Sequence, residues 1–511
     1  MHWSLAIAED IIERRKADKH VVATGITPSG DIHVGNLREL IIGDTVQSAL
    51  VDQGVDARLI YVSDTFDPLR RRYAFLPAEY ETHVGKPLSE IPDPQGCHAS
   101  YADHFLQPFL ESLDKLGIKT ELLRADVLYK SGQYVDVIKE AMARQSDLAR
   151  ILTDVSGREL PEGWSPFSPL CNACGRLTAA IVTDYDPAKD EVSYECECGN
   201  TGVASFKGGG KLAWRVDWAA RWRILGITIE PFGKDHAAPG GSFDTGKQIS
   251  TEIYNYEAPY PIPFEHILLK TKEEGGTKAK IASMSSSRGT NIPVHTILET
   301  VPPEILKYVI SRVKPDKHIA FNPALPLLNL IDEYEREIGE IGHGVAGKIS
   351  FRHLLTLVQI ARGDFTKLLA ATKRSGYAVP ESEEELAELR EKAQYAENWL
   401  RVYAPPSLKF ELQTELPIHE LQSLSSEQKV ALTLMAREIE GGTNLSASDW
   451  HDKIYELATA ANIETKEIFK AIYMALLKKP SGPRAGWLLA SLDSEFLKER
   501  FEAAGWVNTK T

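Results

Sequence analysis

Four of the five cysteines in this chain lie in one short stretch as two closely spaced pairs: Cys171 with Cys174, and Cys196 with Cys198. Thiolates at such spacings can share one tetrahedral zinc ion in a ribbon or knuckle. Because four thiolates leave no open coordination position, the sequence predicts a structural zinc. The remaining cysteine, Cys97, has His98 and His104 nearby, and we interpret it as a buried or surface thiol rather than a ligand.

A second group of residues could bind a nucleotide. The apolar residues 21–24 lead into a turn rich in Gly and Pro, and a helix is expected to begin near His33. Gly35 would let a purine ring approach the backbone, and the N-terminus of a helix favours phosphate charge. We therefore predict that His33, with Asn36, donates hydrogen bonds to phosphate oxygens as charge shifts in the transition state. The alternative is an ordinary strand-to-helix turn with a satisfied histidine.

A basic, hydroxyl-rich segment at residues 278–289 follows another strand-like run, residues 265–269. Such a loop can close over a triphosphate and neutralise charge as pyrophosphate leaves. The alternative is a solvated basic loop. The residues of this loop that we predict to contact ATP are Met284, Ser285, Ser286, Ser287 and Arg288.

A third apolar run, residues 227–230, is followed by Asp235 and His236. In a parallel sheet both would lie at the carboxyl edge, where ligands bind. A carboxylate there can hold ribose hydroxyls, so Asp235 is a predicted ATP ligand, and His236 can contact the substrate. The alternative is a turn in which Asp235 caps a helix.

In this order, the His33-x-Gly35-Asn36 segment and the late serine-rich loop resemble the two signatures of class I aminoacyl-tRNA synthetases, His-Ile-Gly-His and Lys-Met-Ser-Lys-Ser. Asn36 replaces the second histidine, and serines 283 and 286 occupy the two lysine positions. The positive charge of the loop must then come from Arg288, Lys280 or Lys278. We favour Arg288, because its guanidinium fork suits phosphate.

Longer stretches resemble one family, the class I lysyl-tRNA synthetases, over nearly the whole chain. These stretches are residues 27–30, 63–70, 100–105, 214–218, 233–236 and 481–486, together with the four clustered cysteines. The resemblance implies that lysine attacks the α-phosphate of ATP to give lysyl-adenylate, and that the lysyl group then passes to the 2′-hydroxyl of the terminal adenosine of tRNA(Lys). It also implies magnesium with ATP, activation that requires bound tRNA, and an anticodon-binding helical domain.

The same resemblance favours Gly25, Thr27, Trp214 and His236 as parts of the lysine site. A lysine ammonium also needs a carboxylate partner and is supported by an aromatic wall. Asp67 and Asp235 are candidates for this carboxylate, but we place Asp64 and Asp217 in the site. In the alternative interpretation, aspartates 64 and 67 cap a helix that begins at Pro68, and tryptophans 214 and 218 form one buried helix face.

Basic residues near the predicted site could bind the acceptor stem of tRNA on an otherwise acidic protein. In the C-terminal region, Lys478, Lys479 and Arg484 are candidates for contact with the anticodon stem. The candidates near the site are Arg70, Arg71, Arg72, Lys207, Lys211, Lys270, Lys272, Lys278, Lys280 and Arg288.

The composition excludes several other classes of protein. Of 511 residues, 43% are hydrophobic and 25% are charged, which is typical of globular proteins and not of disordered or fibrous ones. No apolar run approaches the roughly 18 residues of a membrane helix, and no signal-type apolar core opens the chain, so we expect a cytoplasmic protein without a membrane partner. The net charge of −14 argues against nonspecific nucleic-acid coating, and no DNA partner is expected.

An α/β framework is needed to bring these residues together. Strand-like runs alternate with helical stretches from residue 21 onward, which predicts a Rossmann-type doubly wound parallel sheet. We divide the chain into the first half of a catalytic domain (1–125), an insertion with the zinc-binding module (126–211), the second half of the catalytic domain (212–330) and an all-α anticodon-binding domain (331–511).

Other functions stay open at this point. One is a class I synthetase for glutamate or arginine, although a glutamate pocket would require cations where we place Asp64 and Asp217. Another is a tRNA-binding protein that has lost catalysis, which only the missing lysines of the late loop support.

Overall fold

The computed structural model describes residues 2–157, 159–272, 279–283, 291–440 and 445–507. The chain divides into two compact units, one made of Met1–Leu298 with Lys307–Phe321 and the other of Glu299–Leu306 with Asn322–Thr511. Within the described residues, no helix combines the length and the apolar character needed to cross a bilayer.

The first unit contains a five-stranded parallel sheet in the order β10-β9-β1-β2-β3. Strands β1 and β2 are almost fully buried, as expected for parallel strands that are covered on both faces. The predicted α/β class with a parallel sheet is confirmed. The strands are β1 (His20–Ile26), β2 (Ala57–Ser63), β3 (Glu121–Arg124), β9 (Ile229–Gly233) and β10 (Tyr260–Phe264).

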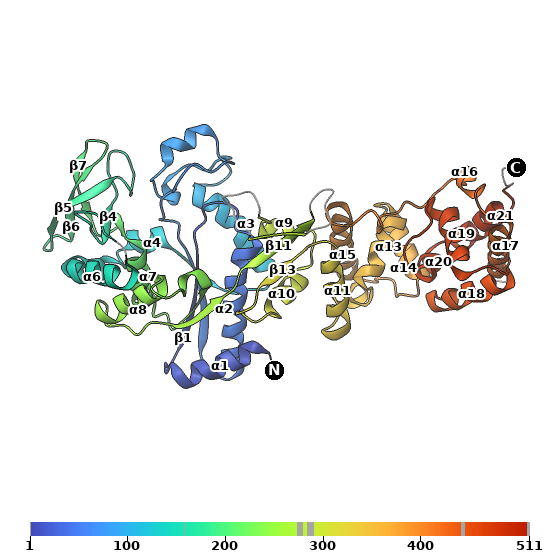
Figure 1. The fold of residues 1–511 in the computed structure, drawn as a ribbon, viewed down its shortest axis with the longest axis horizontal. Helices are drawn as coiled ribbons and strands as arrows, with labels where there is room; N and C mark the ends of the chain where they lie inside the picture. Colours follow the sequence, from blue (N-terminus) through green and yellow to red (C-terminus); the bar gives the residue numbers. More distant parts are fainter. Residues whose placement is uncertain (1, 158, 273–278, 284–290, 441–444, 508–511) are drawn as a thin grey trace. The chain divides into compact units, whose positions relative to one another are not determined.

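Helix α2 (Val34–Asp52) follows β1 and packs along the sheet (Figure 1). Gly43 allows this close packing, because a Cβ atom there would lie 2.9 Å from Leu59 Cδ1 of β2. The chain order reverses across β1, with β2 on one side and β9 on the other, and ligands bind at such points. The other helices around the sheet are α1 (Trp3–Arg14), α3 (Tyr101–Lys115), α7 (Trp214–Leu225) and α8 (Ser242–Glu252).

A smaller sheet of β11 (Ile267–Lys272), β12 (Ala279–Ser283) and β13 (Ile319–Phe321) is joined to α2 by one buried arginine. The Arg38 guanidinium donates to the backbone oxygens of Lys314 and Lys317 at 3.0 and 2.7 Å, and also to the oxygen of Glu265. Arg38 is fully buried, so these carbonyl groups supply the partners that solvent cannot. Helices α9 (Val294–Ile297) and α10 (Pro303–Ser311) lie between β12 and β13 in the chain.

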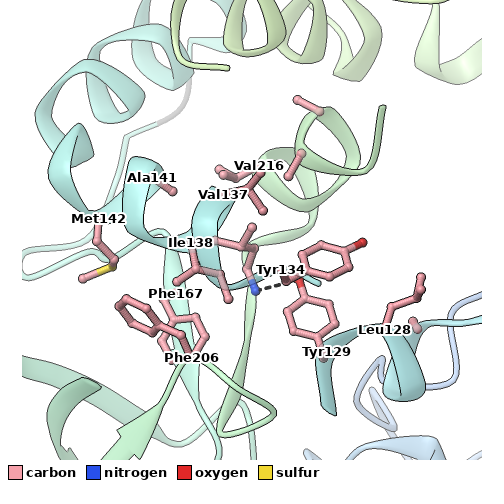
Figure 2. Close-up of a cluster of buried hydrophobic side chains, with 14 of the residues drawn as sticks. Leu128, Tyr129, Tyr134, Val137, Ile138, Ala141, Met142, Phe167, Phe206 and Val216 are labelled. Carbon is pink, nitrogen blue, oxygen red and sulfur yellow. Dashed lines mark hydrogen bonds between the residues drawn. The ribbon is translucent and has the colours of Figure 1, made fainter. Parts of the chain in front are cut away.

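The segment after β3 begins with α4 (Ala125–Ser131), α5 (Val135–Ala143) and α6 (Gln145–Ser156). Helices α5 and α6 are separate because Arg144 leaves the helical conformation between them. Figure 2 shows Tyr129, Tyr134 and Ile138 of this region packed towards Val216 of α7. The two small sheets that follow are β4 (Phe167–Pro169) with β8 (Gly210–Leu212), and β5 (Ala180–Asp186), β6 (Glu191–Cys196) and β7 (Thr201–Ser205).

The second unit is helical in its described part. The helices that end at Glu337, Ala361 and Arg374 are each followed two positions later by a glycine, which favours the end of a helix. The helices are α11 (Leu325–Glu337), α12 (Gly344–Lys348), α13 (Phe351–Ala361), α14 (Phe365–Arg374), α15 (Glu383–Val402), α16 (Ile418–Leu421), α17 (Ser426–Glu440), α18 (Ala447–Ala460), α19 (Thr465–Leu477), α20 (Ala485–Ser491) and α21 (Ser494–Gly505).

Candidate active site

A cavity of about 500 Å³ opens at the carboxyl edge of the sheet, where β1 ends and α2 begins. Its walls come from the turn after β1, from the start of α2 and from the ends of β9 and β10, so the sheet itself brings them together. The residues from β1 and α2 that line it are Gly25, Thr27, His33, Gly35, Asn36 and Glu39.

His33 is the N-cap of α2, and it forms a capping box with Asn36. The backbone N–H of Asn36 donates to His33 Nδ1 at 3.3 Å, and the backbone N–H of His33 donates to Asn36 Oδ1 at the same distance. Each side chain therefore accepts a hydrogen bond from a backbone N–H that has no carbonyl partner within the helix. Histidine is an unusual capping residue, which indicates that the position has a second requirement.

The capping bond determines which ring nitrogen of His33 carries the proton. Because Nδ1 accepts from a backbone amide, the proton of the neutral ring lies on Nε2. Burial lowers the pKa of His33 to about 4, so the ring is neutral near pH 7. Within the described residues, neither His33 Nε2 nor Asn36 Nδ2 has a hydrogen-bond partner, so two neutral donors are available in the cavity.

A second cavity, of about 430 Å³, adjoins the first. Both are lined by Gly25, Thr27, Glu39, Arg70 and His236. An aromatic wall distinguishes the second cavity. The rings of Trp214 and Trp218 stack with centroids 6.1 Å apart, and the His236 ring lies 5.8 Å from that of Trp214. Successive turns of α7 hold the two indoles on one face.

Beneath this second cavity lies a cluster of buried opposite charges. Arg221 of α7 donates to Asp64 Oδ1 at 2.5 Å and to Asp217 Oδ2 at 2.9 Å. Lys211 of β8 donates to Asp67, whose other oxygen accepts from Thr27 Oγ1 at 3.0 Å. The Arg221 guanidinium and the Lys211 ammonium hold the pKa of the Asp64 carboxyl below its ordinary value despite burial. The three aspartate carboxylates of this cluster are therefore balanced by two cations, Arg221 and Lys211.

Two further carboxylates in the same cavity have no cationic partner among the described residues. Glu39 accepts from the Gly25 amide at 2.6 Å, and Glu230 accepts from Trp218 Nε1 at 2.9 Å and from the Trp222 indole. Burial raises the pKa of Glu39 to about 8, although the hydrogen bond from Gly25 opposes the shift. Burial likewise raises the pKa of Glu230 to about 7, against the two indole donors. A cation bound here would favour both ionised forms.

The four clustered cysteines converge at one point in the insertion. The sulfurs of Cys171 and Cys198 lie 3.8 Å apart, and those of Cys174 and Cys196 lie 3.7 Å apart. A tetrahedral zinc with Zn–S bonds of ~2.3 Å would place its sulfurs ~3.8 Å apart, so the donor set fits. The structure therefore brings together a possible metal-binding group at the predicted position.

A second possible metal-binding group lies between β2 and α3. Cys97 Sγ is 3.1 Å from His98 Nδ1, 3.3 Å from His104 Nδ1 and 3.2 Å from Asp93 Oδ2. The four potential ligand atoms all lie within 4.8 Å of one another. The interpretation of Cys97 as an isolated thiol missed this arrangement, because Asp93 enters from an irregular segment with no recognisable ligand spacing.

The predicted site residues fall into three groups. Asp235 lines neither cavity, and its exposed carboxylate lies 3.1 Å from His266 Nε2. The predicted loop contacts Met284, Ser285, Ser286, Ser287 and Arg288 lie outside the described residues. The residues that line one of the two cavities are Gly25, Thr27, His33, Gly35, Asn36, Asp64, Trp214, Asp217 and His236.

Some expectations differ from the structure. No helix begins at Pro68 in the described chain, so aspartates 64 and 67 do not cap one. Lys211 is buried and bound to Asp67, so it is not available to RNA. Sequence reasoning missed Glu39, although positions 35, 36 and 39 share one helix face at the start of α2. It also missed Glu230, and it missed Arg221, whose partner Asp64 lies 157 positions away in the sequence.

Comparison with known proteins agrees with this geometry. A model of the family "tRNA synthetases class I (K)" matches residues 1–348. The lysine–tRNA ligase of Archaeoglobus fulgidus is 46% identical, over 99% of this chain and 100% of that protein. The lysine–tRNA ligase of Methanosarcina barkeri strain Fusaro is 45% identical, over 99% and 98%. That of Methanocaldococcus jannaschii is 38% identical, over 98% and 99%.

A parallel sheet with a His-x-Gly-Asn helix start at its carboxyl edge, within a chain that matches this model, defines a class I aminoacyl-tRNA synthetase. Within that class, the chain belongs to the family described as tRNA synthetases class I (K), the class I lysyl-tRNA synthetases.

Replacing Arg221 by Met should lower the free energy of unfolding by about 3–5 kcal/mol, because the Asp64 and Asp217 carboxylates would stay buried without their shared cation. The deficit should shrink as the pH falls from 8 to 5, since buried carboxyls without a cation have raised pKa values and become neutral. Urea unfolding at both pH values measures the difference.

The matched control is Arg223→Met on the same helix, whose ion pair with Glu140 is partly exposed and should contribute about 0–1 kcal/mol. Equal losses in the two variants would contradict the importance of the buried cluster.

Proposed function

We propose that the protein is a lysine–tRNA ligase that forms lysyl-adenylate from lysine and ATP and then transfers the lysyl group to the 2′-hydroxyl of the terminal adenosine of tRNA(Lys). The observation that carries the choice of lysine is a pair of carboxylates beside an aromatic wall, half-buried Glu39 and buried Glu230, which form no ion pair among the described residues. The similarity to lysine–tRNA ligases over nearly the full chain supports the same choice.

Charge balance explains why this cavity suits lysine. Free lysine carries two ammonium groups, and two carboxylates that have no cationic partner among the described residues can neutralise both. Asp64 and Asp217, which we first assigned to the ammonium, are held by Arg221 and instead form the floor of the site. Trp214 and His236 supply the wall against which the methylene chain packs, and Gly25 and Thr27 line the junction of the two cavities.

Adenylate formation needs orientation and electrostatic stabilisation rather than a covalent enzyme intermediate. The first cavity would hold ATP, with Gly35 under the nucleotide, and the amino-acid carboxylate would approach the α-phosphorus from the second. His33 Nε2–H and Asn36 Nδ2 would donate to phosphate oxygens as negative charge develops there. The loop from Met284 to Arg288 would cover the leaving pyrophosphate, and magnesium would accompany ATP and neutralise phosphate charge.

Transfer to tRNA would use the same cleft. Arg70 lines both cavities and is placed to meet the phosphates of the acceptor end. We propose that the helical region 331–511 binds the anticodon, that residues 1–125 and 212–330 form the catalytic domain, and that residues 126–211 form an insertion. Activation of lysine would require bound tRNA. These tasks are those of a cytoplasmic enzyme.

The alternatives are less consistent with the site. A glutamyl enzyme would have to place a substrate carboxylate beside Glu39 and Glu230, where like charges repel. An arginyl enzyme would meet the same acidic cavity, so only a direct comparison of substrates separates it from lysine. A tRNA-binding protein without catalysis would not need a neutral histidine donor at the start of α2.

We further propose that both possible metal-binding groups hold structural zinc. Cys171, Cys174, Cys196 and Cys198 supply four thiolates, while the Asp93–Cys97–His98–His104 group supplies a mixed set of sulfur, nitrogen and oxygen donors that zinc also accepts. Zinc would join the turn at Cys171 and Cys174 to the end of β6 in the first group, and the segment around Asp93 to the start of α3 in the second.

Among labelled amino acids tested with unfractionated tRNA, only lysine should be charged, and only with ATP. Glu39→Gln should raise the KM for lysine about 10- to 100-fold, because a hydrogen bond to a charged group is lost. In the unchanged protein, this KM should fall up to about tenfold per pH unit towards pH 8, since an ammonium must bind the ionised Glu39. Initial charging rates measure both effects.

The Glu9→Gln variant, altered on an exposed face of α1, is the matched control and should behave like the unchanged protein. Charging of arginine or glutamate would disprove the choice of lysine, and no charging at all would favour the tRNA-binding alternative. An unchanged pH dependence in Glu39→Gln would remove Glu39 from the site.

His33→Asn separates the two roles of His33. Asparagine is a good N-cap, so His33→Asn should keep the stability of α2, whereas His33→Ala should lose about 0.5–2 kcal/mol. Both variants should slow lysyl-adenylate formation about 10²- to 10³-fold, because neither provides the imidazole donor. Pyrophosphate exchange in the presence of tRNA, with thermal unfolding alongside, tests this. A rate in His33→Asn equal to that of the unchanged protein would show that capping alone explains His33.

Elemental analysis of the purified protein should find two zinc ions per chain. Cys171→Ser should lose one and His104→Ala the other, because each removes a ligand from a different group. The control is His419→Ala, an exposed histidine of α16, which should keep both. One zinc ion in His104→Ala and in the unchanged protein alike would show that the Asp93 group holds none.

A further inference from the structure

One wall of the first cavity comes from outside the five-stranded sheet. Arg70, Tyr73 and Phe75 line this cavity, and they lie in the irregular segment between β2 and α3. We call residues 69–105, which end in the first turns of α3, the wall module. Because the wall module lies beside the sheet rather than within it, the shape of the cavity depends on how the module itself is held.

The wall module has a small hydrophobic core of its own. Two backbone hydrogen bonds close the module near the sheet: the Leu69 N–H donates to the Lys86 oxygen at 2.9 Å, and the Gly85 N–H donates to the Leu69 oxygen at 2.8 Å. A core of this size stabilises a fold only weakly, so small modules commonly add a metal or another cross-link. The buried residues of this core are Leu69, Leu76, Tyr80, Leu88, Ile91, Tyr101, Ala102 and Phe105.

The Asp93–Cys97–His98–His104 group is part of the wall module. The buried Asp93 carboxylate accepts from the backbone N–H groups of Gln95 and Cys97 at 2.7 and 2.9 Å, and His104 Nδ1 lies 3.0 Å from Asp93 Oδ1. In the zinc-bound form proposed above, the ion would tie the segment around Asp93 to His104 in the first turn of α3. The metal would therefore fix the direction in which α3 begins.

Tyr101, three residues before His104, connects the start of α3 to the turn after β1. Its side chain is fully buried, and its hydroxyl donates to the Ser29 carbonyl oxygen at 2.8 Å. Ser29 lines the first cavity, four residues before His33. Because a buried hydroxyl is costly to leave without an acceptor, the position of α3 and the position of this turn depend on each other.

Phe105 connects the same turn of α3 to the cavity residues of the wall module. Its ring packs edge-on against the His104 ring, with centroids 4.7 Å apart, and against the Phe75 ring at 5.8 Å. Phe75 in turn stacks on Tyr73 at 5.6 Å and 9°. Adjacent residues of α3 therefore contact the possible metal-binding group and the cavity wall, which makes this helix turn a direct physical link between them.

We propose that Tyr101 is a positioning residue for ATP, which acts through Ser29 and depends on a zinc ion in the Asp93 group. Tyr101 lines neither cavity, so it holds the turn that receives the nucleotide without touching the nucleotide itself. The inference rests on the ATP site and the zinc ions proposed above. It adds that nucleotide affinity and metal retention depend on each other.

This dependence has to be reciprocal. If zinc in the Asp93 group orders the turn and thereby strengthens the binding of ATP, bound ATP must strengthen the retention of that zinc ion by the same factor. For the group of four cysteines we expect no such response, so its zinc ion serves as an internal reference.

The test measures zinc release from the full-length protein to a coloured chelator, with and without ATP and magnesium. Lysine and tRNA are left out, so no adenylate forms. The zinc ion that His104→Ala lacks is that of the Asp93 group. ATP should slow the release of this ion about 2- to 10-fold, the contribution of one buried hydrogen bond, and should leave release from the four cysteines unchanged.

Tyr101→Phe removes only the hydroxyl. This variant should keep both zinc ions, bind ATP about 2- to 10-fold more weakly by calorimetry, and lose the effect of ATP on zinc release. A merely structural hydroxyl would lower thermal stability without changing that response. If circular dichroism shows that His104→Ala does not fold, the ATP-dependent release of the unchanged protein is compared with that of Tyr101→Phe directly.

The matched control is Tyr256→Phe. The Tyr256 hydroxyl also donates to a backbone carbonyl at 2.8 Å, that of Ile227, and Tyr256 lines neither cavity. Its affinity for ATP and the response of its zinc to ATP should therefore be those of the unchanged protein.

Release from the Asp93 group at the same rate with and without ATP would overturn the proposal, as would a Tyr101→Phe variant that keeps the response. Equal slowing of both zinc ions would show a direct effect of ATP on the chelator or on the whole protein, and would also overturn it. Elemental analysis that finds no zinc in the Asp93 group would refute the proposed metal and this inference together, while lysine charging would stand. Two zinc ions and normal charging, with no response to ATP, would refute this inference alone.

Discussion

The structure of the cleft depends on one buried guanidinium. Arg221 binds Asp64, which follows β2, and Asp217 of its own helix, while the Tyr129 hydroxyl of the insertion donates to the other Asp217 oxygen at 2.6 Å. The sheet, the segment after β3 and α7 are therefore linked through the Arg221 guanidinium and its two carboxylate partners. Buried carboxylates without this cation would be expensive to keep ionised.

The cluster also determines what charge remains for a ligand. Arg221 and Lys211 neutralise most of the acidic floor. Among the described residues, the carboxylates of this cavity that have no cationic partner are those of Glu39 on α2 and Glu230 on β9. Their raised pKa values express the cost of burying charge there. A ligand with two ammonium groups relieves that cost, and a ligand that places a second carboxylate there would increase it. The selectivity for lysine that we propose therefore follows from charge that the fold leaves unbalanced.

Features that depend on residues close together in the sequence were predicted correctly, whereas contacts between residues distant in the sequence were missed. The start of α2 at His33, the thiolate pairs and the helix of Trp214 and Trp218 depend on near neighbours, and all are present. The assignment of Asp64 and Asp217 to a substrate ammonium could not be checked from sequence, because their partner Arg221 reaches Asp64 only in the folded chain. Glu39 could have been predicted from the sequence, since helical spacing places it on the same face as Gly35 and Asn36.

His33 shows how one hydrogen bond can serve both folding and chemistry. A serine or aspartate would cap α2 equally well, but neither would present a second donor from a rigid ring. Because Nδ1 accepts the Asn36 amide, the tautomer is fixed and Nε2–H must face the cavity. Burial keeps the ring neutral, so in the role we propose it would donate to phosphate without adding a charge that would bind the ground state of ATP equally well. A neutral, preoriented donor can then act mainly on the charge that develops in the transition state.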